Sequence, residues 1–300
     1  MSDGYRMRRM ERPELDLAID LAAAEGWNPG LGDAEAFWAA DPQGFHIGLL
    51  EGRPAATLSG VRYADQGRPA FDFIGLYIVL PGLRGRGFGK RLWDHVLDGL
   101  SAPTVALDAV TAQEATYRKD GFETFRKSVR HAGNLGGTSG GASAGLPGDW
   151  LSAPGLRPLS EFPWSEVLAY DRRCFPAPRE GFLRVWTSLP GHVALGLERG
   201  GPTGGRLAGF GVVRPCGTGS KIGPLFADDE EGARTLLRAL CASAPTRPVH
   251  FDTPGTNPTA AKLAGELGLR PVFETVRMYR GPAPDVDLDR EFGVTSFELG

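Results

Sequence analysis

A glycine-rich, basic turn carries the clearest chemical signal in this sequence. Three glycines alternate with other residues, and four cations lie among or beside them: Gly85, Gly87 and Gly89 with Arg84, Arg86, Lys90 and Arg91. Glycines allow positive φ angles, so several backbone N–H groups can face one point, and a helix that starts there adds the positive end of its dipole. Guanidinium groups match phosphate oxygens in geometry and charge. The turn therefore predicts a binding site for a pyrophosphate.

Two common nucleotide-binding patterns do not fit this turn. A loop of the type Gly-x-x-x-x-Gly-Lys-Ser/Thr requires Ser or Thr after the lysine, whereas Arg91 follows Lys90 here. A dinucleotide fingerprint that starts at Gly85 requires a small residue where Lys90 stands. The pattern that remains is Arg84-x-x-Gly87-x-Gly89. A turn that merely connects a strand to a helix is the alternative, but it does not explain the four basic residues.

Residues 79–89, VLPGLRGRGFG, resemble the acyl-CoA signature of the GNAT acyltransferases, whose core is (Gln/Arg)-x-x-Gly-x-(Gly/Ala). The resemblance implies acetyl-CoA as cosubstrate, with its pyrophosphate on the amides of the turn and its pantetheine arm on the backbone of the preceding strand. The residues so assigned to the cosubstrate are Ile78, Val79, Arg84, Gly85, Arg86, Gly87, Phe88, Gly89 and Lys90. The resemblance also implies an α/β (α+β) fold, in which a mainly antiparallel central sheet is flanked by helices and splays between its fourth and fifth strands.

A second signature follows in residues 111–122, TAQEATYRKDGF. It resembles the family's motif of Asn or Gln, then Ala, then Tyr, ending in Gly-Phe. Tyr117 stands four residues before Gly121, where the family usually has a tyrosine that faces the CoA sulfur. Attack of an amine on a thioester expels a thiolate, which a positioned phenol can protonate as it leaves. We predict Tyr117 as this general acid; the alternative is an aromatic side chain that packs under the last strand.

The reaction also requires a base, because an amine arrives mostly as ammonium and must lose a proton before it attacks. A carboxylate, or a water path to one, can accept that proton. Asp72, on the strand that leads to the turn, and Asp108, near the end of the next strand, are the candidates. Each could instead be solvated or cap a loop.

The segment between the first two predicted helices is the candidate acceptor site. In GNAT proteins this region usually shapes the acceptor pocket, so the resemblance implies that Trp27 and Asn28 line it. A turn with one packed aromatic ring explains the same residues equally well.

The elements that must position these residues alternate between strands and helices. Apolar runs typical of strands occupy residues 45–51, 54–64, 71–80 and 104–110. A first helix is expected to begin near Pro13, and a second, at 33–41, has Asp33 as its predicted N-cap. A third runs from Gly87 to about residue 100, with apolar residues every fourth position on one face.

The second half of the chain repeats this order more faintly. Its pattern predicts strands at 192–199, 206–216, 221–227, 248–254 and 271–280, and helices at 228–243 and 258–269. The stretch 133–150 is rich in glycine and has the composition of a linker. We therefore predict two tandem GNAT-like domains, at 1–132 and 151–282, with a linker at 133–150 and a tail at 283–300.

The predicted second domain lacks both signatures. Its turn carries acidic residues at 228–231, which would repel a pyrophosphate and satisfy the helix N-terminus themselves. Ala264 stands where the tyrosine is expected. This domain is predicted to be a degenerate copy that does not catalyse in this way. Its glycines and Asp252, Asn257 and Tyr279 either shape a substrate pocket, or the domain only completes the fold and an interface.

Composition narrows the class of protein. The chain has 300 residues, with 33 Lys and Arg against 36 Asp and Glu, and it has no basic stripe or tail, so nucleic acid is not an expected partner. No apolar run approaches the roughly 18 residues of a membrane span, and early charges disfavour an export signal. A cytoplasmic protein without a membrane partner is expected. The three cysteines and five histidines show no metal-ligand spacing, so we expect buried, reduced thiols and no metal.

Together these residues predict an N-acetyltransferase in which a primary amine attacks acetyl-CoA directly in a ternary complex, since the first domain has no cysteine for a covalent intermediate. The alternative is a non-catalytic acyl-CoA binding or sensing module. A nucleotide hydrolase would need phosphate-binding and magnesium-binding residues that the sequence lacks. A small-molecule amine is the expected partner, but the sequence also leaves room for an amino acid, an aminoglycoside-like compound or a protein N-terminus. It does not determine the oligomeric state.

Overall fold

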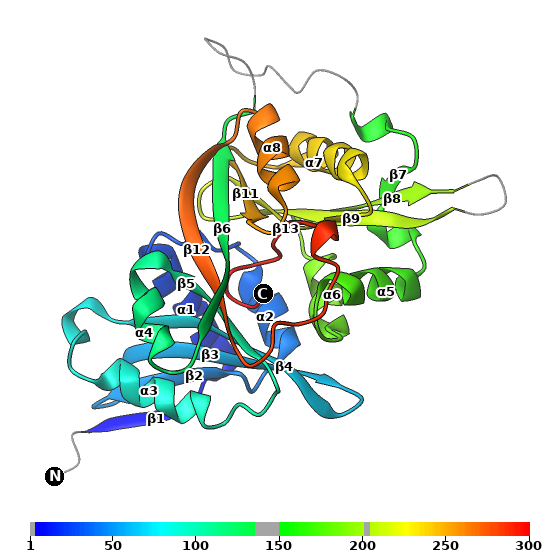
Figure 1. The fold of residues 1–300 in the computed structure, drawn as a ribbon. Coiled ribbons are helices and arrows are strands. Elements are labelled where there is room, and N and C mark those ends of the chain that lie inside the picture. Colours follow the sequence, from blue (N-terminus) through cyan, green and yellow to red (C-terminus); the bar gives the residue numbers. More distant parts are fainter. Residues whose placement is uncertain (1–3, 136–149, 201–204) are drawn as a thin grey trace.

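The computed structural model describes residues 4–135, 150–200 and 205–300, and the two halves repeat one order of elements around a shared sheet (Figure 1). The first half contains β1 (Tyr5–Arg9), α1 (Arg12–Ala24), α2 (Asp33–Ala40), β2 (Phe45–Leu50), β3 (Arg53–Asp65), β4 (Arg68–Val79), α3 (Phe88–Leu97), β5 (Val105–Val110), α4 (Glu114–Arg118) and β6 (Glu123–Gly133). The second half contains β7 (Leu156–Pro158), α5 (Trp164–Cys174), α6 (Glu180–Trp186), β8 (Val193–Arg199), β9 (Arg206–Pro215), β10 (Ser220–Ala227), α7 (Glu230–Ser243), β11 (Val249–Pro254), α8 (Pro258–Glu266), β12 (Arg270–Arg280) and β13 (Glu291–Gly293). Most of the predicted linker, 136–149, lies outside the described residues.

The strands of both halves form one mainly antiparallel sheet. Their order is β1-β2-β3-β4-β5-β12-β6-β11-β10-β9-β8-β7, and β13 pairs with β10 beside this path. In each half one neighbouring pair is parallel, namely β4 with β5 and β10 with β11. The predicted α/β fold with tandem, repeated domains is confirmed.

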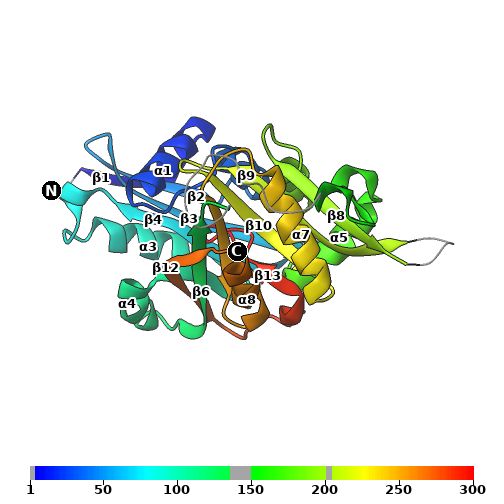
Figure 2. The same cartoon turned by 90° about the horizontal axis from the view of Figure 1, so that it is seen from above.

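The two halves exchange strands at the centre of this sheet. β12 lies between β5 and β6 of the first half, and β6 lies between β12 and β11 of the second half (Figures 1 and 2). Thr275 of β12 faces Val110 of β5, and Val249 of β11 faces Gly133 of β6. Each half therefore completes its sheet with a strand from the other half, an arrangement that no local sequence pattern indicated.

Buried ion pairs join elements of the two halves. They are Arg277 with Asp108, Arg130 with Asp252, Arg214 with Asp33, and Arg126 with Glu291. In each pair the side chains are almost fully enclosed, so removal of one partner would leave an uncompensated buried charge, which typically costs about 3–5 kcal/mol. Three of these pairs hold an exchanged strand, β6 or β12, against the sheet that receives it, and Arg214 with Asp33 joins β9 to α2.

Asp33 differs from its predicted role as the N-cap of α2. The helix begins at Asp33 itself, and Gly32 is the capping residue. The Asp33 carboxylate instead accepts a hydrogen bond from the Gly30 N–H at 2.8 Å and pairs with Arg214 of β9. The Asp33 carboxylate therefore pairs with a buried arginine of the second half instead of capping α2.

The segment predicted as a tail ends inside the fold. Residues 291–300 are buried throughout. β13 pairs with β10 through Leu225 and Phe226, and the Val294 N–H donates to the Asp252 carbonyl of β11 at 2.9 Å, so the segment lies between β10 and β11. It then continues to the first half, where the backbone of Glu298 closely approaches Gly75 of β4.

Candidate functional site

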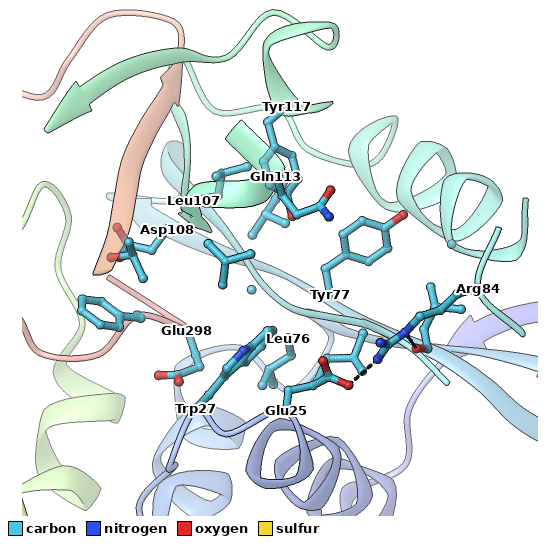
Figure 3. A pocket seen from close by; sticks show the side chains of 18 of the residues that line it. Glu25, Trp27, Leu76, Tyr77, Arg84, Leu107, Asp108, Gln113, Tyr117 and Glu298 are labelled. Carbon is cyan, nitrogen blue, oxygen red and sulfur yellow. Dashed lines mark hydrogen bonds and ion pairs between the residues drawn. The ribbon is translucent and has the colours of Figure 1, made fainter. Parts of the chain in front are cut away.

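The separation of β4 from β5 opens a cavity in the first half. The two strands pair only where Asp72–Ile74 faces Val105–Leu107, and β4 leaves β5 after that point. A cavity of about 530 Å³ occupies the opening (Figure 3). Its lining comes from β4, the glycine-rich turn, β5, α4 and the residue before it, and the segment after α1. The strand β12 and the last residues of the chain complete it. The predicted splay between the fourth and fifth strands is confirmed for this half.

A bulge in β4 shapes the middle of the cavity. Thr57 of β3 faces Ile78, and Ser59 faces Gly75, so one residue of β3 stands opposite both Leu76 and Tyr77. Leu76 has a φ of 49°, which is unusual for a residue with a branched side chain. The Thr57 hydroxyl donates to the Leu76 carbonyl at 2.9 Å and holds the bulge in place. A glycine inside a strand, here Gly75, was the sequence signal that could have indicated this bulge.

The glycine-rich turn lies at one end of the cavity and leaves room for an anion. Gly85 and Gly87 have φ angles of 73° and 84°, and open space lies where their side chains would stand. Gly87 precedes α3, and no side chain caps the start of that helix. Because the first N–H groups of a helix have no partner within the helix, they remain available to phosphate oxygens.

Gly89 is needed for a different reason. A Cβ at this position would lie 2.6 Å from Val79 Cγ2 and 2.8 Å from the Tyr77 hydroxyl. Only glycine therefore allows the first turn of α3 to approach β4 this closely.

Two cationic side chains of the turn, Arg84 and Lys90, line the cavity, and each forms an ion pair that is exposed to solvent. The Arg84 Nε donates to the Val79 carbonyl at 2.8 Å, and its guanidinium pairs with Glu25 (Figure 3). Lys90 pairs with Asp94. The Arg84 and Lys90 side chains are 48% and 59% exposed. Such exposed pairs contribute little to stability, so phosphate oxygens can replace the carboxylates.

Two other residues predicted to bind the cosubstrate support the turn from outside. Neither Arg86 nor Phe88 lines the cavity, whereas Ile78 and Val79 do. Phe88 is buried against the Tyr5 ring, with centroids 4.8 Å apart, and the Arg86 guanidinium lies 5.1 Å from the Phe88 ring centroid. Phe88 thus anchors α3 to β1.

Two tyrosines line the cavity. Tyr117 packs on Trp93 at 5.1 Å between ring centroids, and within the described residues its hydroxyl has no hydrogen-bond partner. Burial raises the pKa of Tyr117 well above its usual value and raises the pKa of Tyr77 to about 12. Both phenols therefore stay protonated at neutral pH and can act as donors. Tyr77 was not predicted, because an apolar strand pattern does not show which side chains of β4 border a cavity.

The structure does not place either predicted carboxylate as a free base. Asp72 is buried outside the cavity, and its carboxylate accepts hydrogen bonds from the Ser101 and Ala102 N–H groups at 3.0 Å each. Asp108 lines the cavity, but Arg277 binds both of its oxygens at 2.9 and 2.7 Å. Asp108 is therefore engaged in an ion pair and is not a free carboxylate of the cavity.

Of the two predicted acceptor-site residues, Trp27 lines the cavity and Asn28 does not. Asn28 has a φ of 53°, and its side chain turns toward the second half. Its Nδ2 donates to the Thr218 carbonyl at 3.0 Å, and its Oδ1 accepts from the Thr218 N–H at 2.8 Å. Asn28 therefore joins the segment after α1 to the turn between β9 and β10.

Residues of the second half also line the cavity, and the sequence pattern did not indicate this contribution. Phe273 and Thr275 come from β12, and Phe297 and Glu298 come from the last residues of the chain. In Figure 3, Asp108 and Glu298 lie on one side of the cavity and Arg84 lies on the other. No local signal marks these residues, because they reach the cavity only through the exchange of β12 and the path of the final segment.

The corresponding place in the second half is filled. β10 and β11 pair over Ser220–Ile222, and beyond this β13 takes the place beside β10. The predicted acidic turn is engaged within the protein, since the Asp229 carboxylate caps α7 by accepting from the Gly232 N–H at 2.8 Å. Asp228 accepts a hydrogen bond from the Tyr170 hydroxyl at 2.9 Å. The three residues considered for a substrate pocket, Asp252, Asn257 and Tyr279, lie outside the cavity of the first half.

Within the described residues, no helix is long and apolar enough to cross a membrane, and no group of three or more His, Cys, Asp or Glu side chains could hold a metal ion. The three cysteines are free and buried, as the sequence indicated.

Comparison with known proteins matches both halves to one family. The profile described as the Acetyltransferase (GNAT) family matches residues 6–122, and an Acetyltransferase (GNAT) domain profile matches residues 167–293. Holothin acyltransferase from Pseudoalteromonas sp. (strain SANK 73390) is 28% identical over 289 residues, which cover 96% of this chain and 92% of that protein.

Solved structures show the same fold. A putative acetyltransferase from Pyrococcus horikoshii superposes with a TM-score of 0.79 at 20% identity, over 100% of this chain and 97% of that one. A tandem GNAT protein from the clavulanic acid biosynthesis pathway superposes with a TM-score of 0.60 at 16% identity, over 93% of this chain and 99% of the other.

Proposed function

Since this chain belongs to the GNAT acyltransferases and carries two of their domains in tandem, we propose that its first half transfers an acetyl group from acetyl-CoA to the primary amine of a small molecule. The observation that carries this proposal is one continuous cavity. It joins the glycine-rich turn to Tyr117 and to the aromatic residues of the second half. A donor and an acceptor molecule can therefore meet inside it.

The charge and shape of the cavity favour acetyl-CoA as the donor. In this proposal the pyrophosphate binds the N–H groups at the start of α3, beside Arg84 and Lys90. The pantetheine arm extends between the separated strands, along Ile78 and Val79. The thioester then lies near the bulge at Leu76, where backbone N–H groups can stabilise the negative charge that develops on the carbonyl oxygen.

The proposed reaction is a direct attack in a ternary complex. The amine nitrogen attacks the carbonyl carbon, the C–S bond breaks, and Tyr117 donates a proton to the leaving sulfur. Holding both reactants in one cavity supplies a large part of the rate. The described residues that line the cavity include no cysteine, so the proposal has no covalent acyl-enzyme.

A screen of amines with acetyl-CoA, following the release of free thiol, tests this function. The panel contains small amines, amino acids, aminoglycoside-like compounds and a peptide N-terminus, and holothin is included because of the named relative. We expect thiol release to depend on an amine and the product to gain one acetyl group by mass spectrometry. Calorimetry should give one acetyl-CoA per chain. One bound acetyl-CoA without thiol release for any amine would favour the alternative of a binding or sensing module.

A further inference from the structure

Glu298 is a buried carboxylate that faces the cavity of the other half. The residue is 3% exposed and lines the same cavity as Trp27 and Tyr117. Within the described residues no side chain or backbone group forms a hydrogen bond or ion pair with its carboxylate. Asp108 on the same wall is tied to Arg277. In the described part of the chain, Glu298 is therefore an unpaired carboxylate inside the cavity, whereas Asp108 is paired with Arg277 and Asp72 lies outside the cavity.

Aromatic side chains surround the position of Glu298. Trp27, Phe273 and Phe297 line this part of the cavity, and the two phenylalanine rings lie 6.4 Å apart between centroids. Figure 3 shows Trp27 beside Glu298. Aromatic faces attract cations and bind planar apolar groups, so this wall suits an organic amine.

Arg130 holds this aromatic wall in place and is not free to pair with Glu298. Its guanidinium donates to the Trp27 carbonyl at 2.6 Å and binds Asp252 at 2.6 and 2.7 Å. It also lies 5.1 Å from the Phe297 ring centroid and 5.6 Å from that of Phe273. The three aromatic residues therefore share one buried support.

The charges that act on Glu298 come from four elements. Lys221 of β10, Asp33 of α2, Arg130 of β6 and Arg214 of β9 contribute. Two of the cations already have carboxylate partners, since Arg214 pairs with Asp33 and Arg130 with Asp252. Burial raises the pKa of Glu298, and Lys221 opposes this rise. A carboxyl group with a raised pKa is better suited to accept a proton near neutral pH than an exposed one.

We infer that Glu298, brought from the end of the chain into the cavity of the first half, is the general base of the reaction, and that Trp27, Phe273 and Phe297 form the subsite for a cationic acceptor amine. This inference rests on the proposed function. It gives the second half a direct part in catalysis, although that half lacks its own acyl-CoA turn.

The acceptor nitrogen loses two protons in the proposed reaction. The ammonium group of the acceptor gives one proton to the Glu298 carboxylate, which later releases it to solvent. The nitrogen lone pair forms the C–N bond, the C–S bond breaks, and the thiolate takes the proton of Tyr117. The second nitrogen proton then restores the Tyr117 phenol. The sum is ammonium and acetyl-CoA giving amide, free CoA thiol and one proton.

The test compares Glu298→Gln with Glu274→Gln in the full chain, on an amine that the parent acetylates. Glu274 is a surface residue of β12 with its side chain 48% exposed, and it lies outside the cavity. We expect Glu298→Gln to lower kcat at least about tenfold, with the acetyl-CoA dissociation constant within a few fold of the parent. The parent kcat should fall as the pH drops and Glu298 becomes protonated. Glu298→Gln should lose this fall of kcat at low pH, the acidic limb of the pH profile, whereas Glu274→Gln should keep it.

Two further measurements separate catalysis from folding. Glu298→Asp retains a carboxylate, so it should keep an acidic limb at reduced kcat. The raised pKa of Glu298 means that the folded state loses stability as pH rises through that pKa, so Glu298→Gln should melt higher than the parent near neutral pH and converge with it in acid. If Glu298→Gln kept both the kcat and the acidic limb of the parent, the inference about Glu298 would be overturned and the proposed function would stand. A parent that acetylates no amine would overturn the proposed function as well.

Discussion

Tyr117 and Tyr77 present two phenols to one cavity, and their positions differ. The Tyr77 hydroxyl lies beside Gly89 at the glycine-rich turn, whereas Tyr117 comes from α4 and packs on Trp93. The two residues therefore allow a comparison between proton donation and support of the cosubstrate.

We expect Tyr117→Phe to lose turnover and keep binding. The substitution preserves the ring against Trp93 and removes the proton donor proposed for the thiolate. General acid catalysis typically contributes about a hundredfold or more, so the acetylation rate should fall at least about tenfold while the acetyl-CoA dissociation constant changes by less than a few fold. Steady-state kinetics and calorimetry measure the two quantities.

Tyr77→Phe serves as the matched control. Because the Tyr77 hydroxyl adjoins the turn, its loss should affect acetyl-CoA binding more than turnover. If Tyr117→Phe turned over like the parent, water would protonate the thiolate or the tyrosine would be structural, and the mechanism would need another donor.

Among the residues of the site, the sequence predicts those that belong to a contiguous motif. The glycine-rich turn and Tyr117 line the cavity because each lies within a few residues of the strand or helix that positions it. The sequence could not show that Asp108 pairs with Arg277, which is 169 positions away. It could not indicate Glu298 either, because no neighbouring residue marks a buried carboxylate near the end of the chain.

Among the elements, the turn before α3 determines whether the cosubstrate binds. We expect Arg84→Glu together with Gly87→Asp to weaken acetyl-CoA binding at least about tenfold, because both changes place negative charge beside the pyrophosphate. Gly87→Asp should also cost some folding stability, because the φ of 84° at this position strains any residue with a Cβ, although Arg84 is half exposed and open space surrounds Gly87. Thermal melting with and without acetyl-CoA separates the two effects, because a ligand stabilises only the state that binds it.

A pair of matched charge changes on another surface provides the control. Arg270→Glu with Gly268→Asp adds the same charge at the edge of the second half, where Arg270 is exposed and Gly268 has open space around it and a φ of 78°. This variant should keep the stabilisation by acetyl-CoA. Equal stabilisation of the Arg84 and Gly87 variant would place the binding site elsewhere.

Most of the longer strands and helices could be predicted from the sequence, because apolar runs and helical spacing are local. β2 to β5 and α7 match the predicted ranges to within a few residues. The bulge at Leu76 was missed, since it depends on the register between β3 and β4. β13 was missed because three residues carry no periodicity, and they form a strand only by pairing with β10.

In the whole molecule, the exchange of β6 and β12 couples the stability of the two halves. Unfolding of either half would remove a central strand from the other and break buried ion pairs such as Arg277 with Asp108. We therefore expect one cooperative thermal transition, with calorimetric and van't Hoff enthalpies that agree. Acetyl-CoA, although bound in the first half, should raise the melting temperature of the entire transition. Two resolved transitions, of which the ligand moved only the first, would show that the halves unfold independently.

The repeated order of elements was visible in the sequence, but the exchange was not. An alternating strand pattern indicates which residues face the core, but it does not show which strand lies beside it. A partner strand from either half fits the same pattern. The boundaries at 132 and 151 remain a prediction about the order of elements along the chain. In space, the first half contains β12, and the second half contains β6.

The same exchange determines how the chain could be divided. A fragment that ends near residue 135 would lack β12 and Glu298, and a fragment that begins near residue 150 would lack β6 and the glycine-rich turn. Each fragment alone would expose unpaired strand edges. Together they would complete one sheet and one cavity. Fused to two interacting proteins, such fragments would form a split enzyme, in which acyl transfer reports that the two proteins have met.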